Sequence, residues 1–362
     1  MGVINKFQNK FYSKRSKTKI NTFLTIKYLK SDIDEYKKMK TKPILFVRHL
    51  SKRYFLKTKP AINNIGFDVF PGEFHAFIGA NGAGKTTTIK SLIGAYANWN
   101  GTVLIKGIRN DKEEAKKKLG YIPENARFPE QFSSIEYLKW MVMLSGWKEK
   151  DAKLFAIKKL KELNMWNLYK KSPNSFSSGQ KKKILLAQAL IHDPDIIIMD
   201  EPTANLDPKA RIEFFDLLET LRKKGKAIFV SSHELAELEQ YADSVTVLDG
   251  GNIVFSGKKK DFVTKIRDKR YYVQVEKNDL LSKYLTSKKI KHYFNEHEDC
   301  FVVFFKNNKQ IYDLQIYMSK NKQLIQRLAF IQPTLEDMYR KFVVKGSVDT
   351  MNINKSNNVE LL

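Results

Sequence analysis

A glycine-rich loop between an apolar run and a helical run is the feature that most constrains this chain. The loop reads Gly79-Ala80-Asn81-Gly82-Ala83-Gly84-Lys85-Thr86; it follows Phe74–Ile78 and precedes Thr87-Thr88-Ile89-Lys90. Three glycines allow backbone N–H groups to turn inward around an anion at the positive end of a helix. Lys85 supplies a positive charge for the β- and γ-phosphates, and the Thr86 hydroxyl can ligate Mg²⁺. Because a strand precedes the segment and a helix follows it, we interpret it as a phosphate-binding loop rather than an incidental turn.

Length, hydropathy and cysteine content narrow the class of protein. The 362 residues are enough for a large α/β domain and a smaller second one. No run approaches the ~18 uninterrupted apolar residues of a membrane span, and the lysine-rich start lacks the apolar middle of a secretory signal. The single cysteine, Cys300, excludes an intrachain disulfide. These features predict a cytoplasmic protein.

The net charge of +26 is concentrated in part at the N-terminus, where residues 1–42 hold 12 Lys/Arg and 3 Asp/Glu. A segment this basic suits an anionic membrane surface or nucleic acid, and lysine also simply keeps a chain soluble. Aromatic and aliphatic residues are mixed with the lysines, so a short basic amphipathic helix is one interpretation of this extension.

From residue 43 to residue 257, apolar strand-like runs alternate with helical runs, which predicts a largely parallel sheet covered on both faces. Residues 62–76 and 101–108 resemble short antiparallel strands, with turns at Pro71-Gly72 and Gly107. The predicted boundaries are 1–42 for the basic extension, 43–257 for the α/β domain with a helical part at about 125–192, 258–345 for a small α+β C-terminal domain, and 346–362 for a disordered polar tail.

Two adjacent carboxylates end the apolar run Ile196–Met199. Asp200 is the candidate Mg²⁺ carboxylate, and Glu201 is placed to orient or deprotonate an attacking water. Two acids alone could be a solvated strand end. A phosphate loop in the same chain favours the catalytic interpretation.

The segment Phe176-Ser177-Ser178-Gly179-Gln180 precedes a helical run and predicts a second anion site at a helix N-terminus. A simple serine helix cap is the alternative. One nucleotide does not need two phosphate cradles from one chain, so the second cradle is more useful to a second subunit. The segment resembles the signature of the ATP-binding cassette (ABC) family, typically Leu-Ser-Gly-Gly-Gln, from which Phe176 and Ser178 depart.

Further motifs follow in the order of that family. Asp207 in Ala204-Asn205-Leu206-Asp207 resembles the D-loop, and His233 in Ser231-Ser232-His233-Glu234 resembles the switch histidine. Tyr54 lies where the family places an aromatic that stacks on adenine, with Phe55 as the alternative. Glu124 replaces the usual glutamine, which keeps oxygen coordination of Mg²⁺ and adds negative charge.

The resemblance implies a P-loop NTPase fold with a RecA-like core, an antiparallel β subdomain and a helical subdomain. It also implies an ATPase using ATP and Mg²⁺ in a head-to-tail dimer, as a homodimer or heterodimer. In each ATP site, Ser177–Gln180 and Asp207 of one subunit would face the phosphate loop of the other. Glu201 and His233 would act in catalysis, and Thr86, Glu124 and Asp200 would act at the metal.

A separate membrane permease is the expected partner, with this chain peripheral on the cytoplasmic face of the cell membrane. Residues 332–339, in Gln-Pro-Thr-Leu-Glu-Asp-Met-Tyr, resemble the closing helix of drug, antibiotic and polysaccharide exporters of the ABC-2 type. Aromatics within residues 125–147 are either anchors for the permease or the insert's own core; they are Phe128, Phe132, Tyr137, Trp140 and Trp147. The alternative function is a non-transport ABC ATPase acting on nucleic acid or the ribosome. Its usual second cassette or long coiled coil is missing from the sequence, so nucleic acid is not an expected partner.

Overall fold

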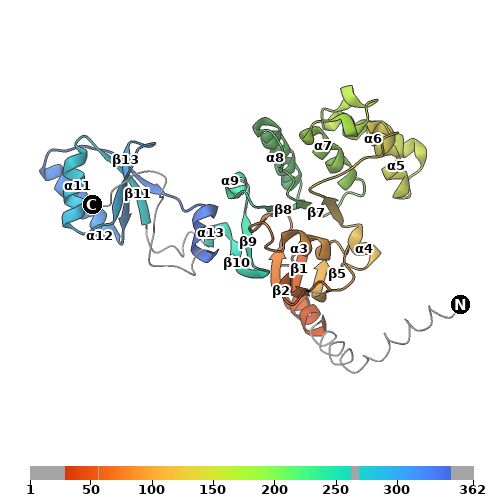
Figure 1. Ribbon diagram of the computed structural model, residues 1–362, viewed down its shortest axis with the longest axis horizontal. Helices are drawn as coiled ribbons and strands as arrows, with labels where there is room; N and C mark the ends of the chain where they lie inside the picture. The colour runs from red at the N-terminus through yellow and green to blue at the C-terminus, as the bar shows by residue number, and fades with distance from the viewer. Residues whose placement is uncertain (1–28, 56, 262–268, 344–362) are drawn as a thin grey trace. The chain divides into compact units, whose positions relative to one another are not determined.

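The computed structural model describes residues 29–55, 57–261 and 269–343. The chain divides into two compact units, Met1–Ser256 and Gly257–Leu362, and Figure 1 shows their elements in chain order. In the described part of the chain, no helix is both long and apolar enough to cross a bilayer. The predicted tail at 346–362 lies outside the described residues.

A six-stranded sheet forms the centre of the first unit, in the order β10-β9-β3-β8-β7-β6. The pairs of β3 with β8 and β9, and of β7 with β6 and β8, are parallel. Helix α3 lies on one side of this sheet, and α7 and α8 lie on the other (Figure 1). The strands are β3 (Phe74–Ile78), β6 (Leu119–Ile122), β7 (Ile196–Asp200), β8 (Ala227–Ser232), β9 (Ser244–Asp249) and β10 (Asn252–Lys258).

A second, antiparallel sheet has the order β2-β1-β4-β5. Its strands are β1 (Leu45–Lys52), β2 (Ile62–Val69), β4 (Asn100–Ile105) and β5 (Ile108–Arg109). The prediction of antiparallel strands over residues 62–76 is confirmed for β2 and wrong for residues 74–76. Those residues belong to β3, which lies in the parallel sheet. Every residue of β3 is buried, as expected of a strand covered on both faces.

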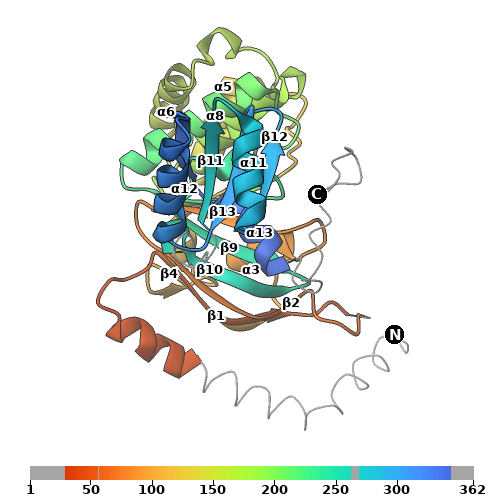
Figure 2. The same ribbon diagram turned by 90° about the vertical axis from the view of Figure 1, so that its left-hand side faces the viewer.

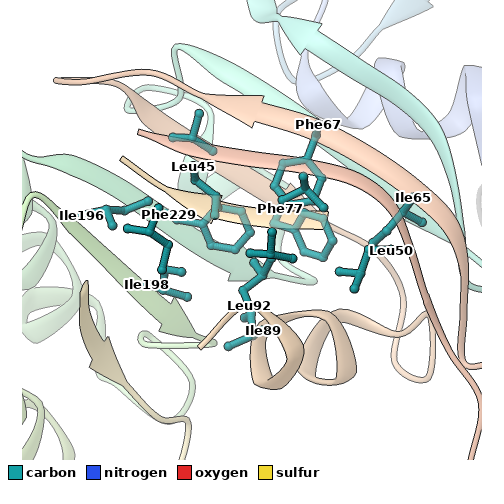
Figure 3. Close-up of a cluster of buried hydrophobic side chains, with 14 of the residues drawn as sticks. Leu45, Leu50, Ile65, Phe67, Phe77, Ile89, Leu92, Ile196, Ile198 and Phe229 are labelled. Carbon is teal, nitrogen blue, oxygen red and sulfur yellow. The ribbon is translucent and has the colours of Figure 1, made fainter. Parts of the chain in front are cut away.

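One apolar core joins the two sheets through α3 (Lys85–Leu92), which follows the phosphate loop. In Figure 3, Phe67 of β2, Phe77 of β3 and Phe229 of β8 lie together, with Ile89 and Leu92 of α3 beside them. Burial of such side chains stabilises a fold by roughly 1.5–3 kcal/mol each. The helix that begins at the loop is therefore fixed by both sheets.

Residues 29–38 form a helix that packs on the antiparallel sheet. The buried Asp32 carboxylate accepts a 2.5 Å hydrogen bond from the Thr102 hydroxyl of β4. The Tyr36 ring meets Phe46 of β1 edge to face, with centroids 5.5 Å apart. The part of the predicted extension from residue 29 onward is thus held by the sheet, and residues 1–28 lie outside the described ones.

The remaining helices of this unit flank the parallel sheet. α5, α6 and α7 contact one another, with a small core of Val142, Ala152 and Ile191. The helices are α4 (Glu113–Lys116), α5 (Ser134–Leu144), α6 (Glu149–Glu162), α7 (Ser178–Ala189), α8 (Pro208–Lys223) and α9 (Leu235–Leu238), with 3-10 turns at Trp166–Leu168 and Pro173–Ser175. The parallel sheet, the antiparallel sheet and this helical part confirm the predicted α/β fold class.

The second unit has its own antiparallel sheet, in the order β12-β13-β11-β14. Chain order and sheet order together define the split βαβ arrangement of ferredoxin-like domains. α11 and α12 lie side by side across β11 and β13 (Figure 2), over a core that includes Val273, Leu281 and Val303. The elements are β11 (Lys269–Val275), α11 (Asn278–Ser287), β12 (His292–Asn295), β13 (Cys300–Phe305), α12 (Asn308–Lys320), β14 (Ile325–Ile331) and α13 (Leu335–Val343).

Candidate functional site

The phosphate loop joins β3 to α3, and two of its glycines have no room for a side chain. Gly84 has φ +109°, and a Cβ there would lie 2.6 Å from the Ala61 carbonyl oxygen. A Cβ at Gly79 would lie 2.6 Å from the carbonyl oxygen of Leu248. Packing against neighbouring backbone, in addition to the turn itself, therefore requires glycine at these two positions.

Lys85 is 5% exposed, and its ammonium is held inside the loop. Nζ donates to the carbonyl oxygens of Gly79 at 2.8 Å and Ala80 at 3.2 Å, and lies 3.1 Å from Glu201 Oε1. Thr86 is exposed in the first turn of α3. The helix thus presents a hydroxyl at the mouth of the loop, with a buried cation behind it.

Ser231 fixes the two carboxylates at the end of β7. Its hydroxyl donates to Asp200 Oδ1 at 2.8 Å and accepts from the Glu201 backbone N–H at 3.0 Å. Asp200 is buried, and Glu201 has φ +43°. A left-handed non-glycine residue is strained and is a frequent feature of functional sites. Here it turns the chain so that adjacent acids point to different partners.

Glu201 lies between two other residues that the sequence analysis singled out, Lys85 and His233. One carboxylate oxygen faces Lys85, and the other lies 2.8 Å from His233 Nδ1. His233 follows β8, the strand next to β7. The carboxylate is therefore oriented by a cation on one side and an imidazole on the other.

Tyr54, rather than Phe55, lies against the loop helix. Its hydroxyl is 3.1 Å from Thr87 Oγ1 and 3.1 Å from the Tyr96 hydroxyl, whereas Phe55 is 90% exposed. The Lys52 ammonium lies 5.1 Å from the centre of the Tyr96 ring and 5.7 Å from that of Tyr54. The hydrogen bond between the Tyr54 and Tyr96 hydroxyls, with burial adding to it, raises the pKa of Tyr96 to about 12. The sequence analysis did not single out Lys52 or Tyr96.

The N-terminus of α7 is a capping box. The Ser177 hydroxyl accepts from the Gln180 N–H, and Gln180 Oε1 accepts from the Ser177 N–H. Gly179 is required here, because a Cβ would lie 2.9 Å from Ala210 Cβ on α8. Ser177 and Ser178 are exposed. Among the residues that the structure describes, no hydrogen bond or ion pair connects this segment to the phosphate loop.

Asp207, which the sequence analysis likened to the D-loop residue, caps α8 by accepting from the Ala210 N–H at 2.9 Å. Beside it is a cluster that the sequence analysis missed. Thr203 donates to Glu237 Oε2 at 2.7 Å, and Arg211 pairs with the same carboxyl group. Burial, reinforced by the Glu234 carboxylate, raises the pKa of Glu237 to about 7. The residues on either side of 204–207 and the short helix after His233 are thus joined through side chains.

Glu124 is exposed in the loop after β6 and accepts from the Asn125 side chain at 3.2 Å. The backbone of this loop is held by Lys182, a residue of α7 that is 5% exposed. Its ammonium donates to the carbonyl oxygens of Pro123 at 2.9 Å and Glu124 at 2.6 Å. Burial lowers the pKa of Lys182 to about 8, against the opposing effect of Glu124 and Asp200.

The oxygen donors of the site suit a hard cation such as Mg²⁺. No group of three or more His, Cys, Asp or Glu side chains in the described ranges could hold a metal alone. Mg²⁺ is commonly bound by one or two carboxylates together with substrate phosphates. The Thr86 hydroxyl and the carboxylates of Asp200 and Glu124 fit that requirement.

The aromatics of the helical part divide into two sets. Phe128 and Tyr137 are buried and pair edge to face at 5.1 Å, so they belong to the core. Trp140 and Trp147 are each 42% exposed. Phe132 lies parallel to Trp140 with ring centroids 6.4 Å apart, and Trp147 meets Phe155 of α6 edge to face at 5.7 Å.

The fold and this site define an ABC-type ATPase, and comparison with known proteins agrees. Residues 62–204 match the model of the ABC transporter family. An ABC transporter ATP-binding protein of Mycoplasma pneumoniae is 45% identical over 273 residues, which are 75% of this chain and 83% of that protein. The chain belongs to the ABC transporter ATP-binding proteins, and it is an ATP-binding ATPase subunit. The resemblance seen in the sequence is thereby confirmed.

Other relatives and solved structures each cover about 60% of the chain. The Nod factor export ATP-binding protein I of Burkholderia orbicola is 32% identical over 60% of this chain and 72% of its own length. A solved ATP-binding subunit of an ABC transporter is 31% identical with a TM-score of 0.55, over 61% of this chain and 92% of that one. cbiO1 of Clostridium perfringens, part of the transporter complex cbiONQ, is 26% identical with a TM-score of 0.55, over 62% of this chain and 91% of that one.

Proposed function

We propose that this chain drives an exporter by hydrolysing ATP in a head-to-tail dimer. The observation that carries the proposal is the separation of two anion-binding elements. The phosphate loop and the exposed α7 N-terminus are both suited to phosphate, yet the interactions of the described residues do not join them within one chain. Two chains arranged head to tail would bring each loop to the other chain's α7, and each nucleotide would lie between them.

In this proposal the phosphate loop, from Gly79 through Thr87, holds the phosphates through backbone N–H groups and the Lys85 ammonium. Tyr54 stacks on the adenine. Ser177–Gln180 and Asp207 reach the same nucleotide from the facing subunit. Fixed donors around the transferred phosphoryl group lower the barrier because they need no reorganisation during the reaction.

Thr86, Asp200 and Glu124 would hold Mg²⁺, which when bound neutralises charge on the β- and γ-phosphates. Glu201 would accept a proton from the attacking water, with His233 holding the carboxylate in orientation. Arrival of the phosphates gives Lys85 new partners. The Glu201 oxygen that faces Lys85 is then released toward the water.

A separate membrane permease is the proposed partner, bound on the cytoplasmic face of the membrane. The exposed Trp140 and Trp147 support this assignment, since large aromatics are enriched among binding hot spots. The domain assignment is likewise proposed: residues 43–257 bind and hydrolyse ATP, and 258–345 are accessory. The name of the Burkholderia relative supports export, and it favours transport over action on nucleic acid or the ribosome.

The first test is the Glu201→Gln variant with ATP and Mg²⁺. General base catalysis typically contributes 10²–10⁴-fold, so turnover should fall by at least about 100-fold while light scattering detects an ATP-dependent dimer. Glu234→Gln, which changes a nearby carboxylate, should keep most of the turnover. Wild-type turnover by Glu201→Gln would exclude Glu201 as the base.

The head-to-tail arrangement is tested by mixing two inactive variants. Lys85→Met disables the phosphate loop, and Ser178→Glu places a negative charge at the α7 N-terminus. A mixed dimer would contain one intact site, formed by the loop of one chain and the α7 of the other. ATPase activity that appears only on mixing supports the proposal, whereas folded variants that stay inactive in a demonstrated mixed dimer contradict it.

A further inference from the structure

We propose that Lys182 is a positioning residue that links the signature helix α7 to the Glu124 loop and so presents the Glu124 carboxylate beside Asp200. The inference rests on the proposed function, in which Glu124 and Asp200 act at the metal. Lys182 itself touches neither nucleotide nor metal in this proposal. It acts through the backbone of the residues that it holds.

The contacts of the Lys182 ammonium are specific. It reaches two consecutive carbonyl oxygens, those of Pro123 and Glu124, at 2.9 and 2.6 Å. Hydrogen bonds from a charged donor are stronger than those between neutral groups. Two such bonds to adjacent peptide groups define both the position and the orientation of the Glu124 backbone.

The helix that carries Lys182 is itself closely fixed along β6. A Cβ at Gly120 would lie 2.8 Å from the Ala189 carbonyl oxygen, so the end of α7 packs directly on this strand. From Lys182 to Ala189, a helix rises about 10 Å. From Glu124 back to Gly120, an extended chain spans about 13 Å at most. The two lengths are similar, so α7 and the segment from Gly120 to Glu124 run side by side in opposite directions. Lys182 holds one end of this overlap, and the Gly120–Ala189 contact holds the other.

Charge gives Lys182 a second effect on the same loop. Glu124 and Asp200 both act electrostatically on this ammonium, and its positive charge partly offsets two carboxylates in one small region. The family's usual residue at position 124 is a neutral glutamine. Lys182 is thus placed to compensate the added negative charge of Glu124.

The two neighbouring lysines have different surroundings and provide controls. Lys183 pairs with Glu213 on α8 at 3.0 Å, and Lys181 is partly exposed. Only the middle lysine of the three is buried against the Glu124 loop. A general effect of positive charge on α7 would appear in all three positions, whereas a positioning effect would appear only at Lys182.

The test measures binding of the non-hydrolysable analogue AMP-PNP to the full chain while Mg²⁺ is titrated. Lys182→Met should raise the half-saturating Mg²⁺ concentration by about 10-fold, in the range seen when an outer-shell partner of a metal ligand is removed. AMP-PNP binding without Mg²⁺ should stay within about twofold. Lys182→Arg should restore most of the Mg²⁺ effect, and Lys181→Met should behave as wild type. Wild-type Mg²⁺ dependence in folded Lys182→Met would overturn the proposal.

A double-mutant cycle with Glu124→Gln separates positioning from general destabilisation. If Lys182 acts through the Glu124 carboxylate, Lys182→Met should change the Mg²⁺ dependence far less in the Glu124→Gln background. The same fold-change in both backgrounds would overturn the inference. Lys182→Gln, which keeps one donor, replaces the methionine variant if that variant fails to fold. Absence of Mg²⁺-dependent ATPase activity in the wild-type chain would instead count against the proposed function.

Discussion

Lys85 and Glu201 form an ion pair beside the phosphate loop, with Nζ and Oε1 3.1 Å apart. The cation assigned to the phosphates and the carboxylate assigned to the water thus neutralise each other. Both side chains are largely buried, so a change of partner for Lys85 removes the cation that faces one of the two Glu201 oxygens. In the proposed mechanism, nucleotide binding and activation of the water are linked through this pair.

The ion pair predicts a specific effect on nucleotide affinity. Glu201→Gln should bind ATP more tightly than wild type in the absence of Mg²⁺, because Lys85 no longer leaves a carboxylate to meet the phosphates. An increase of about 3- to 10-fold corresponds to about 1 kcal/mol. Isothermal titration calorimetry measures it, and Glu234→Gln serves as the control for loss of a nearby negative charge. Equal gains in both variants would mean that the ion pair itself has no special role.

Substitutions of Tyr54 and of Phe55 should affect ATP binding differently. Tyr54→Ala should weaken ATP binding by about 10-fold, because stacking of a base on an aromatic ring contributes about 1–3 kcal/mol. Tyr54→Phe keeps the ring and should lose less, with only the hydrogen bonds to Thr87 and Tyr96 removed. Phe55→Ala should bind as wild type. Fluorescence titration with ATP and GTP compares the variants, and a larger loss from Phe55→Ala would reverse the assignment.

Gly84 should tolerate substitution much less well than Gly82. Both have positive φ, at +109° and +81°, but only a Cβ at Gly84 meets neighbouring backbone, the Ala61 carbonyl at 2.6 Å. The conformational cost of Gly82→Ala is about 1–2 kcal/mol. Gly84→Ala adds a clash that moves either the loop or the start of β2. Chemical denaturation of both variants should show a clearly larger loss of unfolding free energy for Gly84→Ala.

His75 should make the stability of the first unit depend on pH. It is buried in β3 beside the rings of Phe67 and Phe229, which also contact each other, and it is hydrogen bonded to Ser244 and Thr246. Burial lowers the pKa of its imidazole to about 3, while an unfolded histidine titrates near ~6.5. Between these values the unfolded chain binds a proton that the folded chain does not, so stability falls as pH falls.

Below about pH 6.5, His75 should lower the unfolding free energy by up to ~1.4 kcal/mol for each pH unit of acidification. Above about pH 6.5, its effect on the unfolding free energy should no longer change with pH. His75→Phe should remove this slope, because the ring is replaced by one that does not titrate. Urea denaturation of both proteins at pH 5 and pH 7.5 measures the difference. Identical slopes in both proteins would mean that another group accounts for the pH dependence.

The parts of the site that could be predicted lie in short contiguous segments. Lys85, Asp200 and Glu201 could be recognised because the chemistry of each depends on its immediate neighbours, a glycine turn or a buried strand end. Ser231 binds both acids only because β8 pairs with β7, and Lys182 reaches Glu124 only because α7 lies along β6. Such contacts depend on which elements become neighbours, which no local pattern contains.

The burial of aromatic residues also depends on which elements become neighbours. Tyr137 and Trp140 are three residues apart on α5 and could not be separated into core and surface from the sequence. The direction of the helix relative to α7 decides it, since the Tyr137 hydroxyl donates to Gln188 at 2.6 Å. The ferredoxin-like topology of the second unit likewise depends on strand order, which a sequence of strands and helices does not specify.

The helix at residues 29–38 sets a limit on how this protein can be shortened. Arg48 of β1 joins Glu35 of that helix to Asp68 of β2, at 2.8 and 2.9 Å. A chain cut at Pro43 would lose this three-residue bridge, uncover the Phe46 side of β1 and leave Thr102 without its carboxylate acceptor. Weaker membrane binding by such a truncated chain could therefore result from its lower stability instead of the loss of the basic extension. Removal of residues 1–28 alone separates the two effects.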